Sequence, residues 1–207
     1  MERSNREVSF DHYNLMYREI DPQEAADRTG LDFDRTRSRF SLQTLGHEVY
    51  AQWPEFKLIP AVAETCPVSL YGFQMQILIM RVLCKGVNAP SCGKFKAYRE
   101  LPWGDLYDTN FNGRCIKRFA STFGYKPDHF ILAAEKLNGV RLDLGDVSFD
   151  FLFIGGITVR FILWTGDDEF SPSAQILFSD NSPLLYNAED LVVICEIIIG
   201  TMMARES

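Results

Sequence analysis

Apolar residues recur every three or four positions in some stretches of the chain and alternate with polar residues in others. The first spacing predicts amphipathic helices and the second predicts strands with one buried face. Gly, Pro, Asn and Asp end most of these stretches, as is typical of turns and helix caps. We predict helices over residues 10–20, 22–29, 67–85, 127–137 and 187–204, one broken or two short helices over 103–123, a hairpin over 40–53, and strands over 56–60, 94–101 and 173–179.

The strongest strand signal lies in residues 147–164, where two apolar runs flank Gly155 and Gly156. Two glycines between apolar runs are typical of a hairpin with a two-residue turn. In that register, Asp150 and Arg160 point to opposite faces and do not neutralise each other. Because both faces are mainly apolar, we expect the hairpin to be covered on both sides. The register places Phe153 opposite Thr158, Phe151 opposite Arg160, Phe149 opposite Ile162, and Val147 opposite Trp164.

The order of elements is helices, strands, helix, strand, helices, strands, helix, without the regular alternation of a doubly wound fold. This order predicts an α+β fold with a central antiparallel or mixed sheet flanked by helices, including those at 67–85 and 187–204. Residues 32–39 alternate in charge and are expected to form an exposed connection. No Gly-, Ser- or Pro-rich linker divides the 207 residues, so we expect residues 1–207 to form one domain.

The charge is uneven along the chain. The formal net charge is -7, and residues 141–207 alone hold 11 acidic and 3 basic residues. A chain of this charge repels phosphate backbones, so we expect no nucleic-acid partner. The acidic C-terminal third is either a solvated surface or a face for a cationic protein partner.

Cysteine spacing and hydropathy favour a cytoplasmic protein. The five cysteines include no C-x-x-C pair, which suits reduced thiols better than a disulfide framework or a metal cluster. The first eight residues are polar and do not resemble a signal peptide. The most apolar stretch, residues 191–204, is too short to cross a bilayer, which needs about 20 apolar residues. We therefore expect no membrane association.

Two segments, LPWGDLYDTNFNGR and LWTGDDEFSPSAQILFSDNSPLLYNAEDL, resemble the uncharacterised family named domain of unknown function 3786. Shorter similarities are FSLQTLGHEVY and KFKAYREL, so the resemblance extends over about residues 10 to 204. It implies a cytosolic bacterial or archaeal protein, typically from an anaerobe. Some relatives carry an N-terminal four-cysteine iron–sulfur region, but this chain has no cysteine before Cys66. The family implies no reaction and no catalytic residues.

The first candidate site is the acidic triplet Asp167, Asp168 and Glu169, which directly follows a predicted strand. Adjacent carboxylates repel each other, so one of them would have a raised pKa and serve as a general acid or base, or the group would hold a cation. The alternative is a solvated turn whose side chains cap nearby amides.

The second candidate is a cationic and aromatic group. Arg99 and Arg114, with Trp103 and Tyr107 between them, would wall a pocket for an anionic or aromatic ligand. The alternative is a surface that forms salt bridges with the acidic C-terminal third. The other members of the group are Lys94, Lys96, Tyr98, Lys117 and Arg118.

Arg160 and Trp164, from the predicted hairpin, complete the candidate ligand-binding residues. A buried arginine needs a carboxylate or a ligand as its partner. The three histidines lie on separate predicted elements, so we expect no metal site. Cys66 stands at a predicted helix start but has no evident histidine partner, which favours a structural thiol.

These observations support three functional hypotheses, and none of them identifies a cofactor. The first is a non-catalytic accessory module of anaerobic metabolism that binds a small molecule or cofactor. The second is a small lyase, isomerase or hydrolase that uses one of the acidic-loop carboxylates. The third is a subunit of a larger complex, which would expose an apolar patch to a protein partner.

Overall fold

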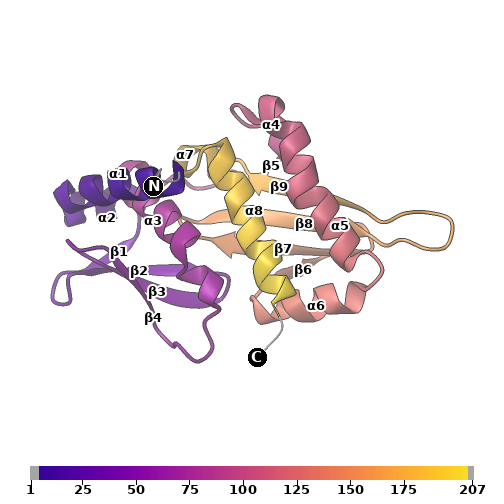
Figure 1. The fold of residues 1–207 in the computed structure, drawn as a ribbon, viewed down its shortest axis with the longest axis horizontal. Helices are drawn as coiled ribbons and strands as arrows, with labels where there is room; N and C mark the ends of the chain where they lie inside the picture. Colours follow the sequence, from indigo (N-terminus) through magenta and orange to yellow (C-terminus); the bar gives the residue numbers. More distant parts are fainter. Residues whose placement is uncertain (1–4, 205–207) are drawn as a thin grey trace.

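Two antiparallel sheets, one small and one large, lie side by side in the computed structural model, which describes residues 5–204 (Figure 1). The α+β fold predicted from the sequence is confirmed. Instead of one central sheet, however, the N-terminal strands form a sheet of their own.

The small sheet has the order β1-β2-β3-β4, and each strand pairs with the next along the chain. The predicted hairpin is confirmed, with Leu45 and Gly46 as its turn, and β4 is an edge strand as expected. Residues 32–34 are not a plain connection, because they pair with β2. The strands are β1 (Asp32–Asp34), β2 (Arg39–Thr44), β3 (His47–Gln52) and β4 (Lys57–Pro60).

Three helices accompany the small sheet: α1 (Asn5–Glu19), α2 (Pro22–Thr29) and α3 (Phe73–Lys85). Tyr17 of α1 packs on Phe40 of β2, and its hydroxyl donates to the carbonyl of Gln52 at 3.1 Å. The predicted helix over 67–85 is interrupted, since a 3-10 turn η1 (Val68–Leu70) precedes α3. The cap predicted for α2 is present, because the Asp21 carboxylate accepts two backbone N–H groups.

The large sheet has the order β5-β9-β8-β7-β6, so the β7–β8 hairpin lies at its centre. The predicted strand over 94–101 is reduced to three residues, which are followed by a 3-10 turn η2 (Tyr98–Glu100). The strands are β5 (Phe95–Ala97), β6 (Val140–Leu142), β7 (Val147–Phe153), β8 (Ile157–Trp164) and β9 (Ser173–Ser179).

The register predicted for the β7–β8 hairpin is wrong by one residue. Its loop has three residues, Ile154, Gly155 and Gly156, and Phe153 lies opposite Ile157. Gly155 and Gly156 adopt positive φ values, 80° and 74°, in a region that residues with a side chain rarely occupy. The extra loop residue shifts every cross-strand partner predicted for the hairpin.

The prediction that Asp150 and Arg160 point to opposite faces is also wrong. The two residues lie directly opposite each other and share a face. Arg160 donates from Nε and Nη2 to the two carboxylate oxygens of Asp150, each at 2.8 Å. The guanidinium also stacks on the ring of Phe95, 3.7 Å from its centroid.

Helices cover one face of the large sheet (Figure 1). Aromatic contacts join them to the strands, such as Phe111 with Phe178 and Phe119 with Phe161. The break predicted within 103–123 is a π-helical segment, η3, between two α-helices. The helices are α4 (Gly104–Phe111), η3 (Asn112–Lys117), α5 (Arg118–Phe123), α6 (Pro127–Lys136), α7 (Ser182–Leu185) and α8 (Ala188–Met203).

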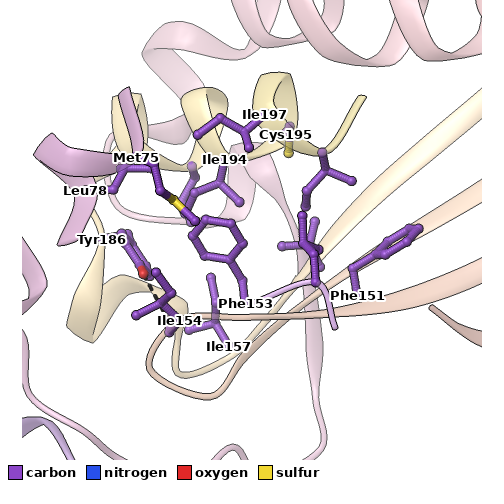
Figure 2. Packing of buried hydrophobic residues seen from close by; sticks show 14 of the residues in the cluster. Met75, Leu78, Phe151, Phe153, Ile154, Ile157, Tyr186, Ile194, Cys195 and Ile197 are labelled. Atoms are coloured by element: carbon purple, nitrogen blue, oxygen red, sulfur yellow. Dashed lines mark hydrogen bonds between the residues drawn. The ribbon is translucent and has the colours of Figure 1, made fainter. Parts of the chain in front are cut away.

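One apolar core joins these layers. Figure 2 shows side chains of α3, α8 and the β7–β8 hairpin in contact, with Met75 and Phe153 near its centre. The tip of the β2–β3 hairpin reaches the large sheet, where the Leu45 N–H donates to the Leu152 carbonyl at 3.1 Å.

The opposite face of the large sheet is only partly covered, contrary to the expectation for residues 147–164. Ile162 and Ser148 are buried, and Gly145 lies against Ile162, but Leu152 is 55% exposed and Val140 64%. We call this surface the open face. Its residues are Phe95, Ala97, Val140, Leu142, Ser148, Asp150, Leu152, Thr158, Arg160, Ile162, Trp164, Ser173, Gln175, Leu177 and Ser179.

Candidate functional site

The turn before α4 holds Trp103 in an unusual conformation. Its φ of 66° lies in the left-handed region, which residues other than glycine rarely occupy. The turn is fixed by two hydrogen bonds, from the Leu101 N–H to the Tyr98 carbonyl and from the Gly104 N–H to the Leu101 carbonyl. A Cβ on Gly104 would lie 1.8 Å from that Tyr98 oxygen, so only glycine allows this close approach. The turn leaves the Trp103 side chain 69% exposed.

A small apolar pocket lies between this turn and the start of α8. Its volume is about 190 Å³, below the roughly 300–1,000 Å³ of pockets that enclose a drug-sized ligand. The pocket therefore suits a group no larger than an amino-acid side chain. Its lining residues are Leu101, Pro102, Trp103, Pro183, Tyr186, Asn187, Ala188 and Leu191.

The polar atoms of the pocket walls are used to hold the walls together. The Tyr98 hydroxyl, beneath the turn, donates to the Ala188 carbonyl at 3.1 Å, and the Tyr186 hydroxyl donates to the Ile154 carbonyl at 3.0 Å (Figure 2). Burial raises the pKa of both hydroxyls, that of Tyr98 to about 12, so both remain protonated donors at neutral pH. The Asn187 side chain accepts the Asp190 N–H at 2.9 Å. These bonds give the pocket fixed walls.

Tyr107 lies in α4, four residues after Trp103. Tyr107 is 54% exposed, and Leu106 beside it is 68% exposed. Trp103 lines the pocket and Tyr107 does not, so of the two predicted aromatic residues the structure places only Trp103 at the pocket.

Arg114 lies further along the same run of helix, but carboxylates of α8 occupy its guanidinium. Its Nε and Nη2 donate to Glu196 at 2.9 and 2.8 Å, and its Nη1 donates to Glu189 at 3.0 Å. The hydrogen bonds to Glu196 raise its pKa most, followed by those to Glu189. This arrangement corresponds to the alternative of salt bridges with the acidic C-terminal third.

The remaining candidate ligand-binding residues are dispersed. Arg99 is exposed on η2, two residues before the pocket lining begins. Arg160 and Trp164 lie on the open face, on the other side of the large sheet from α4. Arg160 has a protein carboxylate as its partner, and hydrogen bonds from Arg160 to Asp150 raise the arginine pKa.

The acidic triplet lies in the exposed loop between β8 and β9, and none of its side chains lines the pocket. The Asp167 carboxylate accepts the N–H groups of Phe170 at 2.7 Å and Glu169 at 2.9 Å. These bonds lower the Asp167 pKa, whereas a general acid at neutral pH needs a raised one. The geometry of Asp167 is that of a turn that caps its own amides.

The sequence did not indicate the α7–α8 side of the pocket. Pro183, Tyr186 and Leu191 line it, yet they lie about 80 positions from Trp103 in the chain. No local pattern in the sequence marked this side of the pocket.

Two further observations concern metals and membranes. Among residues 5–204, no three His, Cys, Asp or Glu side chains are grouped so that they could hold a metal ion. Within the same described range, no helix has the length and apolar character needed to span a bilayer.

Fold and site together define an α+β protein with a small rigid pocket whose lining carries no free titratable side chain. Residues 21–201 match the family described as domain of unknown function (DUF3786), and the chain belongs to that family. Comparisons with curated proteins and with solved structures found no match.

Proposed function

We propose that the protein is a non-catalytic, cytosolic binding module, and that the pocket beside Trp103 takes a small apolar or aromatic group of a small molecule. The observation that carries this proposal is the chemistry of the lining. Its side chains are apolar except for the indole N–H of Trp103 and the polar groups of Tyr186 and Asn187, and the Tyr186 hydroxyl and the Asn187 side-chain oxygen are already bonded within the protein. A lining of this kind supplies contact area but no acid, base or nucleophile.

The pocket walls support the proposal because they are fixed before any ligand arrives. Trp103 stands in a conformation that costs about 1–3 kcal/mol for a residue with a side chain, and the turn around it maintains that conformation. A preformed aromatic wall reduces the ordering cost of binding. The cytosolic assignment is supported by the five cysteines, all of them free thiols.

The test is a titration with small aromatic and branched aliphatic compounds, followed by amide NMR. We expect at least one compound to shift the signals of Gly104, Ala188 and Leu191, and Trp103→Ala to weaken that binding about tenfold or more. Trp164→Ala is the matched control, since it removes a partly exposed indole from the open face. The proposal fails if no compound shifts these signals, or if Trp103→Ala binds as well as the natural chain.

A further inference from the structure

The open face of the large sheet lacks the unpaired charges of a strand surface that is exposed to water. Asp150 and Arg160 are its only charged strand residues, and they are bonded to each other. Their side chains are only 17% and 20% exposed. Most of the other residues of the face are apolar, or carry small neutral polar groups.

Large apolar side chains on this face lie in contact with solvent. Val140 is 64% exposed, Leu152 is 55% exposed and Trp164 is 39% exposed. Val140 and Leu152 stand on the adjacent strands β6 and β7, beside Asp150, whereas Trp164 lies beyond the buried Ser148 and Ile162 at the other end of the face. Apolar surface that is contiguous rather than scattered marks an interaction site.

We propose that this open face is a dimer interface, covered in solution by the open face of a second copy of the chain. The distribution of charge on the molecule supports a second copy of the chain as the occupant of the open face. The molecule carries a net charge of -7, whereas the charged strand residues of the open face are one acidic and one basic residue, bonded to each other. The strands of two open faces can therefore meet without a net repulsion between them.

The ion pair also makes the face complementary to itself. Arg160 and Asp150 lie side by side across β8 and β7. A two-fold axis parallel to the strands and between them places Arg160 of each copy over Asp150 of the other. Such an isologous arrangement uses the same patch twice and closes at two copies.

The size of the face fits a weak dimer. Three strands of seven or eight residues and two strands of three residues, about 4.8 Å apart, give a surface of roughly 450 Å² per copy, or about 900 Å² in total. That value is slightly below the roughly 1,000 Å² expected of a stable specific interface and lies in the range of weak, transient contacts. The interface lies on the far side of the sheet from the Trp103 pocket, so it is independent of the proposed function.

Sedimentation equilibrium of the full chain between about 1 and 300 μM tests this proposal. We expect the average mass to rise with concentration towards that of two chains and no further. Leu152→Lys and Val140→Lys each place an ammonium group in the interface, and each should weaken dimerisation about 30-fold. Both side chains are exposed in the single chain, so circular dichroism should show an unchanged fold.

Leu132→Lys is the matched control, because Leu132 is 58% exposed on α6, in the helical layer on the other side of the sheet. It should leave the dimer unchanged. A chain that stays monomeric throughout the concentration range overturns the proposal, and so does a dimer that both Leu152→Lys and Val140→Lys leave intact. Capture of a different protein by a monomeric chain would show that the face has another occupant.

Discussion

The two sheets of this protein each have a face without helices, but the two faces differ in composition. The outward face of the small sheet carries charges on every strand, whereas the open face of the large sheet carries a single ion pair. One chain thus contains a sheet surface suited to water and a sheet surface suited to a partner. The charged residues on the outward face of the small sheet are Asp32, Asp34, Arg39, Glu48 and Lys57.

The same difference is visible in one arginine from each face. Arg39 stacks on Tyr50, 3.5 Å from the ring centroid, and the Tyr50 hydroxyl donates to Glu48. Arg160 stacks on Phe95 in the same manner, but it also holds both oxygens of Asp150. In the small sheet Asp34 pairs with Arg37 of the following loop at 3.8 Å, whereas in the large sheet both partners of the ion pair lie on the face itself.

The largest effect should come from removing the carboxylate of the open face. Asp150→Ala leaves the Arg160 guanidinium half-buried without its partner, which should lower the free energy of unfolding by about 2 kcal/mol. Glu48→Ala, on the small sheet, should cost about 0.5 kcal/mol or less. Urea denaturation of both variants gives the two values.

A double variant separates loss of the ion pair from loss of packing. Asp150→Leu with Arg160→Met removes both charges, so it should recover most of the stability that Asp150→Ala loses. If Asp150→Ala and Glu48→Ala cost the same, the two faces are equally solvated and the contrast drawn above is wrong.

A smaller effect is expected from the stacked rings. Phe95→Leu removes the aromatic cover of a guanidinium already shielded from water, and should cost about 1 kcal/mol. Tyr50→Leu removes the ring that stacks on Arg39 and should cost about 0.5 kcal/mol. Thermal unfolding of the two variants measures the difference, and a larger loss for Tyr50→Leu would contradict this ranking.

The smallest effect on stability is expected from Asp146, in the loop before β7. The Asp146 carboxylate accepts the N–H and hydroxyl of Thr165, and these bonds, chiefly the backbone one, lower its pKa. A carboxyl whose pKa is lower in the folded chain stabilises the fold above its ordinary value of about 3.9 and loses that contribution as the pH falls. Asp146→Ala should therefore lower the Tm slightly at pH 7.

The pH dependence of that difference is the measurement. The Tm gap between the natural chain and Asp146→Ala should persist down to about pH 5 and close as the pH approaches 2. Asp34→Ala is the control from the small sheet, since Asp34 also accepts backbone N–H groups in a loop. A gap that widens in acid would show that the bonds to Thr165 do not stabilise the ionised carboxyl.

Local signals were readable from the sequence, and distant pairings were not. Asp21 and Gly30 mark the ends of α2 because caps act within a few residues. The β7–β8 register failed because both faces of the hairpin are largely apolar, so the pattern cannot show that Ile154 belongs to the loop. Because the predicted register was wrong, the pairing of Asp150 with Arg160 was missed as well.

The candidate site shows the same division. The sequence proposed both Trp103 and Tyr107 as pocket walls, and the structure places Trp103 in the pocket lining without Tyr107. The neighbours of Trp103 on α7 and α8 are brought there by tertiary packing, which no local pattern encodes. The partners of Arg114 were foreseen only as acidic residues of the C-terminal third, because the choice of Glu189 and Glu196 depends on how α8 lies beside η3.

The hydrogen bond from the Leu45 amide to the Leu152 carbonyl has a consequence for cooperativity. Through it, the tip of an N-terminal hairpin pairs with β7 beyond the end of β6, and Leu45 itself is buried in the common core. A shortened chain that begins after residue 60 would leave an unpaired strand edge and an uncovered apolar surface at that point. We therefore expect residues 5–60 to unfold together with the rest of the chain, and calorimetry should record a single transition for both sheets.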